Sequence, residues 1–503
     1  MAVIAAAAAL LLTPTVLIVM AGAALLGLLV GALPGLTATL GVALLIPFAV
    51  LLDPVPALAG VVTLAAVAIA AGDLPGALLR IPGTPASAAY ADAAHRLAQR
   101  GKAGLALTTG LVCAALGGLF GALVLLMAAP GLARLALHVS TVERFWLAVL
   151  GLSAAVAVAG PSPARGALAL LIGLTLALVG LDPVSGQPRL TFGLTDLSGG
   201  VGLIPVLIGL FAVSRVLRHA AGVDADPAAP PRPGPLLRDL GPALRQRAGR
   251  IAIGSGVGTV VGAVPGAGAD IAAYVAQAVT RRRLPRGAPE ATPDAADAAD
   301  LDAIAPAGAA NNAAIGGALV PATVLGIPGD SLTAVVIGVL MLKGLTPGPT
   351  VFLTQPTTMT AVLLAFLVAN LLLVPAGLVA IALARPLLRV PRAVLMPVIL
   401  GVCLVGTYAA AGTVTALVVM MLAGGLGLAM EAHRIPLAPA VLGLVLGPMV
   451  EEMALTSLMK SGGDPLVLLS RPPAIALAVL CALVWLAPVA VRRMSPQRAR
   501  TQP

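Results

Sequence analysis

The chain has 503 residues, of which 59% are hydrophobic and only 10% carry a charged side chain. Soluble domains carry about 25% charged residues, so this composition excludes an ordinary soluble protein. The net charge of +10 does not indicate nucleic-acid binding, because aromatic residues that would stack on bases amount to only 2%. The basic residues lie in short loops between hydrophobic runs, as the positive-inside rule predicts. We therefore expect a membrane protein without a nucleic-acid partner.

Long uncharged runs predict the membrane helices. The segment from Met1 to Met20 lacks the positive n-region of a signal peptide, and we interpret it as a retained first membrane helix. Later uncharged runs lie at 54–72, 103–133, 145–164, 197–214, 251–269, 303–329, 344–384, 393–430 and 472–491. The sequence predicts an all-α polytopic membrane protein of roughly 11 to 13 helices and half-helices, since a span needs about 20 apolar residues.

Cysteine and histidine residues give no sign of a metal or catalytic centre. Cys113, Cys403 and Cys481 lie far apart in apolar runs, which predicts buried thiols rather than disulfides or metal ligands. The four histidines are isolated. We expect no catalytic residues, no metal site and no cofactor.

The motif Ile-Pro-Gly interrupts two hydrophobic runs almost half the chain apart. It occurs as "RIPGTPAS" from Arg80 and as "GIPGDSLT" from Gly326. An earlier break precedes each one, "GALPGLTAT" from Gly31 and "GAVPGAGAD" from Gly262. Proline removes a backbone donor and glycine permits a reversal. The same order of breaks in both halves is typical of transporters built from two repeats, although chance repetition in a chain rich in proline and glycine is the alternative.

Charge placement predicts that the repeats are inverted. Positive charge follows the second break in the first half but lies between the breaks in the second half. Equivalent loops would then face opposite sides of the membrane, with hairpin-like Pro-Gly breaks near the midplane. The predicted domains are a first transmembrane repeat (1–220), a cytoplasmic Pro/Arg-rich linker (221–250), a second transmembrane repeat (251–430), and a C-terminal transmembrane segment with a basic cytoplasmic tail (431–503).

The breaks also predict a binding site for an anion. Broken helices persist in membranes where they line a cavity, and a new helix amino terminus attracts negative charge. The alternative is a structural turn whose hydroxyl groups bond locally. The predicted substrate-binding residues at the breaks are Pro34, Gly35, Pro82, Gly83, Thr84, Ser87, Pro265, Gly266, Pro328, Gly329 and Ser331.

Five polar residues near the breaks complete the predicted site. Asn311 and Asn312 lie in an uncharged run and are predicted to bind substrate, with interhelical hydrogen bonding as the alternative. Arg80 is predicted to pair with a substrate carboxylate; it would otherwise reach the cytoplasm or pair with Asp73. Asp270 and Asp330 are predicted to couple an ion, and the alternative is helix capping.

Four segments resemble the large permease subunit of tripartite tricarboxylate transporters, the TctA family. They are "GALPGLTATLGVALLIPFA" (31–49), "LLRIPGTPASAA" (78–89), "NNAAIGGALVPATVLGIPGDSLTAVVIGVLMLKGLTPGP" (311–349) and "LAPAVLGLVLGPMVEEMALTSLMKSGGDPLVLLSRP" (437–472). The resemblance implies a multi-pass permease of the bacterial cytoplasmic (inner) membrane that imports tricarboxylates such as citrate, or related carboxylates. It also implies a small integral-membrane subunit (TctB-like), a periplasmic or extracellular solute-binding protein (TctC-like), and Na⁺ or H⁺ as the coupling ion.

The chain departs from the family pattern at three places. Arg80 stands where an asparagine is usual, the segment 92–95 reads "DAAH" instead of "DGYP", and the "APE" before the paired asparagines is replaced by "APAGAANN" (305–312), which has one residue more and no acid. These departures concern substrate identity and ion coupling more than the fold. The alternatives to a permease are a channel or exporter for small organic anions and, less favoured, a membrane enzyme.

Overall fold

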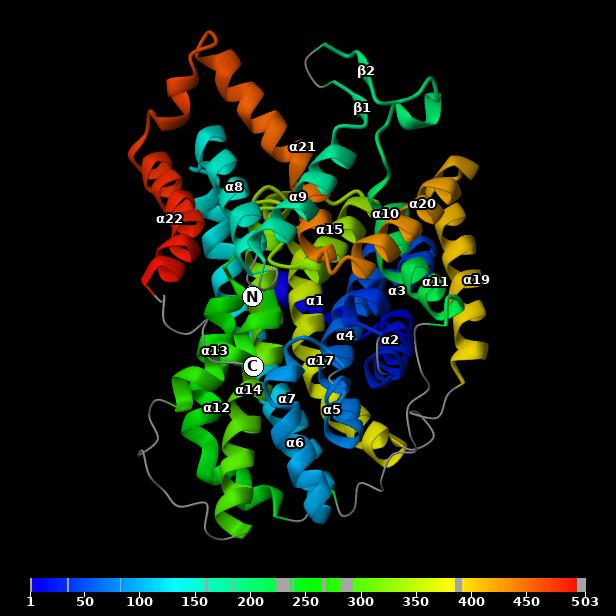
Figure 1. The fold of residues 1–503 in the computed structure, drawn as a ribbon, viewed down its shortest axis with the longest axis vertical. Helices are drawn as coiled ribbons and strands as arrows, with labels where there is room; N and C mark the ends of the chain where they lie inside the picture. Colours follow the sequence, from blue (N-terminus) through cyan, green and yellow to red (C-terminus); the bar gives the residue numbers. More distant parts are fainter. Residues whose placement is uncertain are drawn as a thin grey trace. The chain divides into compact units, whose positions relative to one another are not determined.

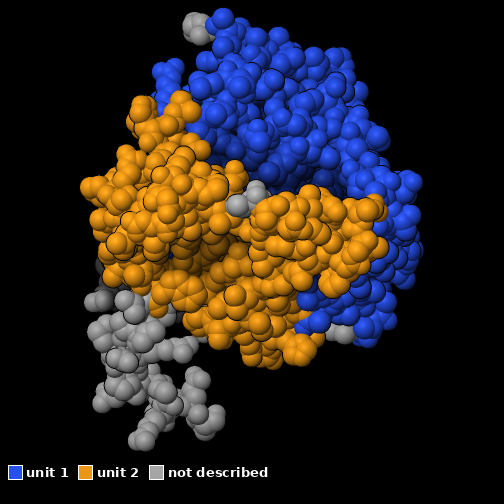
Figure 2. Space-filling view, turned by 90° about the horizontal axis from the view of Figure 1, so that it is seen from above, with its two compact units in different colours: residues 1–134, 202–429 blue, residues 135–201, 430–503 orange. Residues whose placement is uncertain are grey.

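The computed structural model describes residues 2–33, 36–81, 83–158, 162–182, 185–222, 236–237, 239–264, 268–281, 293–384 and 391–494. The chain forms two compact units, which Figure 2 colours separately. Unit 1 comprises residues 1–134 and 202–429, and unit 2 comprises residues 135–201 and 430–503. These units reflect contacts between helices, whereas the boundaries predicted from the sequence describe repeats. Those boundaries stay a prediction.

Unit 1 contains the helices that surround the Pro-Gly breaks (Figure 1). They are α1 (Ala2–Leu11), α2 (Pro14–Ala32), α3 (Ala38–Leu51), α4 (Pro54–Ala71), α5 (Asp73–Leu79), η1 (Ser87–Ala89), α6 (Ala91–Leu97), η2 (Ala98–Lys102), α7 (Ala103–Ala136), α10 (Leu203–Ile208), η4 (Gly209–Val213), α11 (Ser214–Ala220), α12 (Leu240–Gly262), α13 (Gly268–Arg281), α14 (Pro293–Val324), α15 (Ser331–Leu342), α16 (Val351–Thr354), α17 (Pro356–Ala382), α19 (Arg392–Ala411) and α20 (Val414–Ala432).

Unit 2 packs its helices around the contact between α9 and α21, where a Cβ on Gly173 would lie 1.9 Å from Ala440 O. The indole of Trp485 on α22 donates to Ser153 Oγ on α8 at 3.1 Å. The antiparallel strands β1 and β2 pair Gly180 with Arg189. The elements are α8 (Thr141–Val158), α9 (Pro163–Ala177), β1 (Gly180–Leu181), β2 (Pro188–Arg189), η3 (Thr195–Leu197), α21 (Leu437–Lys460), η5 (Pro465–Leu469) and α22 (Pro472–Met494).

The prediction of an all-α polytopic membrane protein is confirmed. Nine helical stretches of the described residues are long and apolar enough to cross a membrane, and five shorter apolar helices accompany them. The segment predicted as the first membrane helix, Met1 to Met20, is divided between two helices, because the chain breaks at Thr13 and the candidate span α2 starts at Pro14. Proline has no backbone N–H to donate and therefore suits the first position of a new helix.

Glycines bring equivalent helices of the two predicted repeats into close contact. α2 packs on α4, and α12 packs on α14. A Cβ on Gly31, the last glycine before the first break, would lie 2.3 Å from Ala68 O, and one on Gly262, before the third break, would lie 2.2 Å from Ala314 O. Because no side chain stands between the backbones, the helices approach closely, as small residues allow in membranes.

We expect Gly258→Ala to destabilise unit 1 by about 1–3 kcal/mol, the usual cost of overpacking a tight contact. A Cβ there would lie 2.5 Å from Ala310 O, so the backbone of α12 or α14 has to shift. Gly256→Ala is the matched control on the same helix, because nothing lies within 4 Å of its Cβ position. Thermal unfolding in detergent measures the difference. Equal midpoints for the two variants would contradict the predicted contact.

The two Ile-Pro-Gly breaks have the same local geometry. Ile81 N donates to Pro75 O at 3.2 Å, and Ile327 N donates to Pro321 O at 3.2 Å. The glycine of each motif then packs on an earlier part of the chain: a Cβ on Gly83 would lie 2.6 Å from Gly72 Cα, and one on Gly329 would lie 3.1 Å from Ala318 Cβ. The repeat seen in the sequence is therefore also a repeat of backbone structure.

A reciprocal hydrogen-bonded turn follows each Ile-Pro-Gly break. In the first half Thr84 N donates to Ser87 Oγ and Ser87 N donates to Thr84 Oγ1, both at 3.1 Å. In the second half Asp330 N donates to Thr333 Oγ1 at 2.9 Å and Thr333 N donates to Asp330 Oδ1 at 2.8 Å. Such a capping box satisfies two backbone donors at a helix start.

Helices α4 and α14 run in opposite directions where they meet. Asn312 on α14 donates to Ala66 O on α4, its counterpart 246 residues earlier, at 3.1 Å. The same interval of 246 residues separates Ile81 from Ile327, so equivalent positions of the two predicted repeats meet here. Asp73 follows Ala66 in the chain and lies beside Gly110. Gly110 packs on Gly308, which precedes Asn312 on α14. The opposite directions of α4 and α14 support the predicted inversion.

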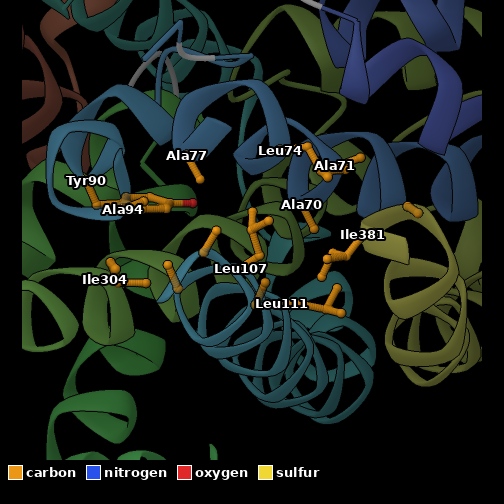
Figure 3. Close-up of a cluster of buried hydrophobic side chains, with 14 of the residues drawn as sticks. Ala70, Ala71, Leu74, Ala77, Tyr90, Ala94, Leu107, Leu111, Ile304 and Ile381 are labelled. Atoms are coloured by element: carbon orange, nitrogen blue, oxygen red, sulfur yellow. The ribbon is translucent and has the colours of Figure 1, made fainter. Parts of the chain in front are cut away.

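A large buried cluster lies beside the first Ile-Pro-Gly break. It joins Leu74 and Tyr90 to Leu107 of α7 and Ile304 of α14. Figure 3 shows the hydroxyl of Tyr90 directed into this cluster rather than toward the surface. A polar group in this position needs a partner, and the Tyr90 hydroxyl donates to Asp73 Oδ1 at 2.6 Å.

Candidate functional site

Three helices start at one place in unit 1. The hydroxyl groups of Thr39, in the first turn of α3, and Ser331, the first residue of α15, lie 3.2 Å apart. Gly268, the first residue of α13, packs on Asp330: a Cβ on this glycine would lie 2.5 Å from Asp330 Cβ. The N-cap residue of α3, Thr37, accepts from Leu40 N at 3.1 Å. The amino termini of α3, α13 and α15 therefore converge.

α3 and α15 lie side by side and point the same way. Thr39 and Ser331 meet at the starts of the helices, and Lys343 Nζ donates to Val50 O at 2.9 Å and to Leu52 O at 2.5 Å at their ends. Burial lowers the pKa of Lys343. Helices of 14 and 12 residues extend about 21 Å and 18 Å, short of the ~30 Å hydrocarbon core. Both are half-helices.

This convergence favours a negative ligand. The first N–H groups of a helix have no partners within the helix, and the helix dipole adds partial positive charge there. Ser331 is partly exposed, and Pro328 and Gly329 before it are buried. Asp330 carries a negative charge at the same place, but its carboxylate caps α15. The predicted ion-coupling role of Asp330 is not tested by this arrangement and stays a prediction.

The turn after the first Ile-Pro-Gly break contacts α13 away from the start of that helix. This turn, η1, contacts both α13 and α14, and Gln277 Nε2 on α13 donates to Ala89 O at 3.2 Å. Thr84 and Ser87 are buried, at 7% and 1% exposure, and their hydroxyl groups bond to each other's backbone. The helix that starts after this break, at Ala91, is interrupted by a kink at Gly101 (φ 79°). The two breaks are therefore alike locally but not equivalent as anion sites.

Arg80 lies at the surface of unit 1. Its Nε donates to Asp92 Oδ1 at 2.8 Å, and both side chains are more than 60% exposed (67% and 64%). The suggested alternative pairing with Asp73 is wrong for this structure, because Asp73 accepts from Tyr90 instead. Arg80 has φ 58° at the end of α5, a left-handed conformation that is uncommon for a residue other than glycine.

Asn311 and Asn312 are buried in the centre of unit 1. Asn311 Nδ2 donates to Tyr90 Oη at 3.3 Å, and Asn312 Nδ2 donates to Ala66 O and to Asn370 Oδ1 at 3.1 and 3.3 Å. Their amide nitrogens thus make the interhelical bonds that the sequence left as an alternative. Their Oδ1 atoms have no hydrogen-bond partner among the described residues, so these oxygens are the groups left for a ligand.

Several predicted site residues lie outside the described residues. These are Pro34, Gly35, Pro82, Pro265 and Gly266. Asp270 lies on α13, and its side chain is likewise outside the description. Their predicted roles stay predictions.

Sequence reasoning missed two groups that the fold places at the breaks. One is the pair of hydroxyl residues Thr37 and Thr39, whose position directly after the first Pro-Gly was a usable signal. The other is the buried pair formed by Asp73 and Tyr90, whose hydroxyl donates to Asp73 Oδ1 at 2.6 Å. Nothing in the sequence placed Tyr90 beside Asp73, because the turn after the break sets their contact.

An ion-pair network joins the two halves of unit 1 beyond α6. Arg100 pairs with Asp297 at 2.6 Å and with Asp300 at 2.5 Å. Arg96 also pairs with Asp300, and Lys102 with Asp297. The two carboxylates are 9% and 6% exposed, so the pairs are shielded from water more than ordinary surface pairs. The network fixes the start of α14 against η2.

Comparison with known proteins identifies the family. Residues 17–442 match the family described as the tripartite tricarboxylate transporter TctA family. This chain belongs to the TctA family. It is 30% identical over 467 residues to a protein of Agrobacterium vitis called "Uncharacterized 52.8 kDa protein in TAR-I ttuC' 3'region", covering 92% of each chain.

A second protein of Agrobacterium vitis, "Uncharacterized protein in TAR-II ttuC' 3'region", is 31% identical over 191 residues, which is 37% of this chain and 79% of that protein. No solved structure matches the chain. As a TctA family member, the chain is a permease subunit of a tricarboxylate transporter and a multi-pass membrane protein, rather than a member of an enzyme family.

Proposed function

We propose that this TctA permease imports tricarboxylates or related carboxylates by ion-coupled alternating access, as part of a three-protein system of the bacterial cytoplasmic membrane. The other two components are a small TctB-like membrane subunit and a TctC-like solute-binding protein. The observation that carries the proposal is the meeting of the amino termini of α3, α13 and α15. Family membership supports it independently.

The converging helix starts suit a ligand with several carboxylate groups. Each start offers backbone N–H groups to one carboxylate, and the hydroxyl groups of Thr39 and Ser331 are neutral donors that do not repel an ion. Three helix starts around one anion match the number of carboxylate groups in a substrate that has two or three of them. A cation bound at the same time would offset the remaining charge, which accounts for coupling to Na⁺ or H⁺.

The inverted arrangement of the halves supports alternating access. The contact between Asn312 of α14 and Ala66 of α4, at equivalent positions of the two predicted repeats, supports a centre of the repeat arrangement at these helices. In inverted-repeat transporters one repeat-derived unit rocks against the other around a fixed central site. Substrate delivered from outside would reach the helix starts in one state and leave toward the cytoplasm in the other.

The charge of Asp330 can be separated from its capping role. Asparagine caps helices as well as aspartate, so Asp330→Asn keeps α15 but removes one negative charge beside the converging starts. We expect this variant to keep its dependence on the driving ion and to bind carboxylates about two- to fivefold more tightly, in line with one partly screened charge. Competition binding and gradient-driven uptake measure the two properties. A variant that accumulates substrate without regard to the gradient would assign ion coupling to Asp330.

Uptake of labelled citrate and a panel of dicarboxylates tests the proposed function. Cells express the chain with or without its cognate small subunit and solute-binding protein, and sodium and proton gradients are imposed separately. We expect saturable accumulation that needs all three proteins and one gradient. Downhill, non-saturable flux through the chain alone would favour the channel alternative. Failure to accumulate any carboxylate with all three proteins in place would contradict the substrate class.

A further inference from the structure

A buried carboxyl group lies directly beside the first Ile-Pro-Gly break. Asp73 is the first residue of α5 and is 8% exposed. The residue before it, Gly72, accepts a hydrogen bond from Gly83 N at 3.1 Å, so Asp73 is attached to the backbone contact that closes the break. The candidate anion site at the start of α15 does not use it.

The hydrogen-bond chain around Asp73 fixes the direction of each donor. Tyr90 has one hydroxyl proton, and this proton is directed to Asp73 Oδ1 at 2.6 Å. Asn311 Nδ2 donates to the same hydroxyl oxygen at 3.3 Å, so that oxygen is the acceptor in this second bond. Asp73 Oδ2 is buried and has no hydrogen-bond partner among the described residues.

The neighbours of Oδ2 do not neutralise a negative charge. A Cβ on Gly110 would lie 3.0 Å from Asp73 Oδ2, and Ile304 lies beside the same glycine. Among the described residues no cationic group forms an ion pair with Asp73. The titratable groups that face this carboxyl are Tyr90, from the segment after η1, and Cys113 of α7. An ionised carboxylate with one hydrogen bond in such surroundings is strongly unfavourable.

We propose that Asp73 is the residue that carries the coupled proton during transport, bound at Oδ2. This inference rests on the proposed function and names the group that the driving ion uses. A proton from water on one side forms an O–H bond at Oδ2 and neutralises the carboxyl group. The same proton leaves to water on the other side after the permease changes conformation, and the Tyr90 hydroxyl stays bonded to Oδ1 throughout.

A proton suits this place better than a metal cation. Hard cations need a cage of several oxygen ligands, whereas one lone pair is enough for a proton. Near Oδ2 the structure places the backbone of Gly110 and the apolar side chain of Ile304. The Tyr90 oxygen already accepts from Asn311 and donates to Oδ1.

The position at the break explains how proton binding would bias the conformation. Opening the contact between Gly72 and Gly83 admits water to Oδ2 and favours the ionised form, whereas closing it favours the protonated form. A group whose two protonation states prefer different conformations couples proton binding to that change.

Infrared difference spectroscopy on the purified protein tests proton binding without transport. We expect a pH titration of the wild type to show the carbonyl band of a protonated carboxyl group that Asp73→Asn removes. Asparagine has nearly the shape of the protonated acid, so this variant should fold. Asp73→Glu is the conservative variant, and its band should return at a shifted frequency. If the Asp73→Asn variant shows every carboxyl band of the wild-type spectrum unchanged, the proposal is overturned.

Transport in proteoliposomes that contain all three proteins tests the coupling, with the citrate and dicarboxylate panel as probes. We expect Asp73→Asn to reduce the accumulation driven by a pH gradient at least about tenfold. The rate at which labelled substrate exchanges for unlabelled substrate should stay within about twofold of the wild-type rate. Asp53→Asn is the matched control, an exposed acid before α4.

Accumulation at the wild-type level by Asp73→Asn would overturn the assignment. So would a wild type that responds to a sodium gradient and not to a pH gradient. If the wild type neither exchanges nor accumulates any probe, the proposed function fails, and the infrared titration still decides whether Asp73 binds a proton.

Discussion

Gly83→Ala is expected to lower the initial rate of carboxylate uptake at least about tenfold. The added methyl group overpacks the backbone contact at the break itself, which costs about 1–3 kcal/mol. A Cβ at this position would lie 2.6 Å from Gly72 Cα and 2.7 Å from Gly72 O. These are backbone atoms, so no side chain can turn away to make room. The hydrogen bond from Gly83 N to Gly72 O at 3.1 Å would be lost or lengthened.

The measurement is uptake normalised to the amount of permease in the membrane, with the partner proteins present. Gly22→Ala on α2 is the control, because nothing lies within 4 Å of its Cβ position. It should transport at the wild-type rate. Wild-type uptake by Gly83→Ala would show that the tight contact between the glycines is not needed for function.

Removing the hydroxyl groups of Thr39 and Ser331 should weaken substrate binding most strongly of all side-chain changes at the helix starts. Hydrogen bonds to charged groups contribute about 1.5–3 kcal/mol each, so Thr39→Val and Ser331→Ala should each raise the apparent KM by roughly ten- to a hundredfold. Valine keeps the branched shape of threonine, which leaves the packing of α3 intact. The two hydroxyl groups are 3.2 Å apart, and the effects of the two substitutions should therefore not add.

A purely structural role predicts a different result. The bond between the two hydroxyl groups would then hold α3 against α15, and each variant would lose about 1 kcal/mol of stability with an unchanged KM. Thr354→Val on α16 is the control, since its exposed hydroxyl group donates to Thr350 O at 3.2 Å. Measuring KM and the unfolding midpoint on the same samples separates the two roles.

The proposed site for carboxylates depends on a difference between the two breaks that the repeated motif did not predict. The repeated Ile-Pro-Gly motif predicted two facing breaks with similar roles. The structure confirms that the breaks are alike in their backbone hydrogen bonds. Only the second one leads into a half-helix whose start meets Thr39 and Gly268. The sequence contained this difference, because the segment after Thr84 lacks the long apolar run that follows Ser331.

The roles of single polar side chains depended on contacts between distant segments. Asp330 could be assigned to a cap or to ion coupling, and its bond to Thr333 N shows that the cap is formed. Asn311 and Asn312 could serve a ligand or bond between helices, and their nitrogens bond to Tyr90 and Ala66. In each case the residue type allowed both roles, and the neighbouring helix decided which atoms remain for a ligand.

The sequence by itself determined the class of this protein, since long uncharged runs are stable only as membrane helices and proline with glycine must interrupt them. Repetition of the motifs also predicted two related halves. Only the tertiary structure decided which helix starts converge and that Asp73 lies buried against Tyr90. The physical reason is the distance along the chain over which each effect acts. Hydrophobicity and helix breaking act within one segment, whereas burial and hydrogen bonding of a side chain depend on which other segment packs against it.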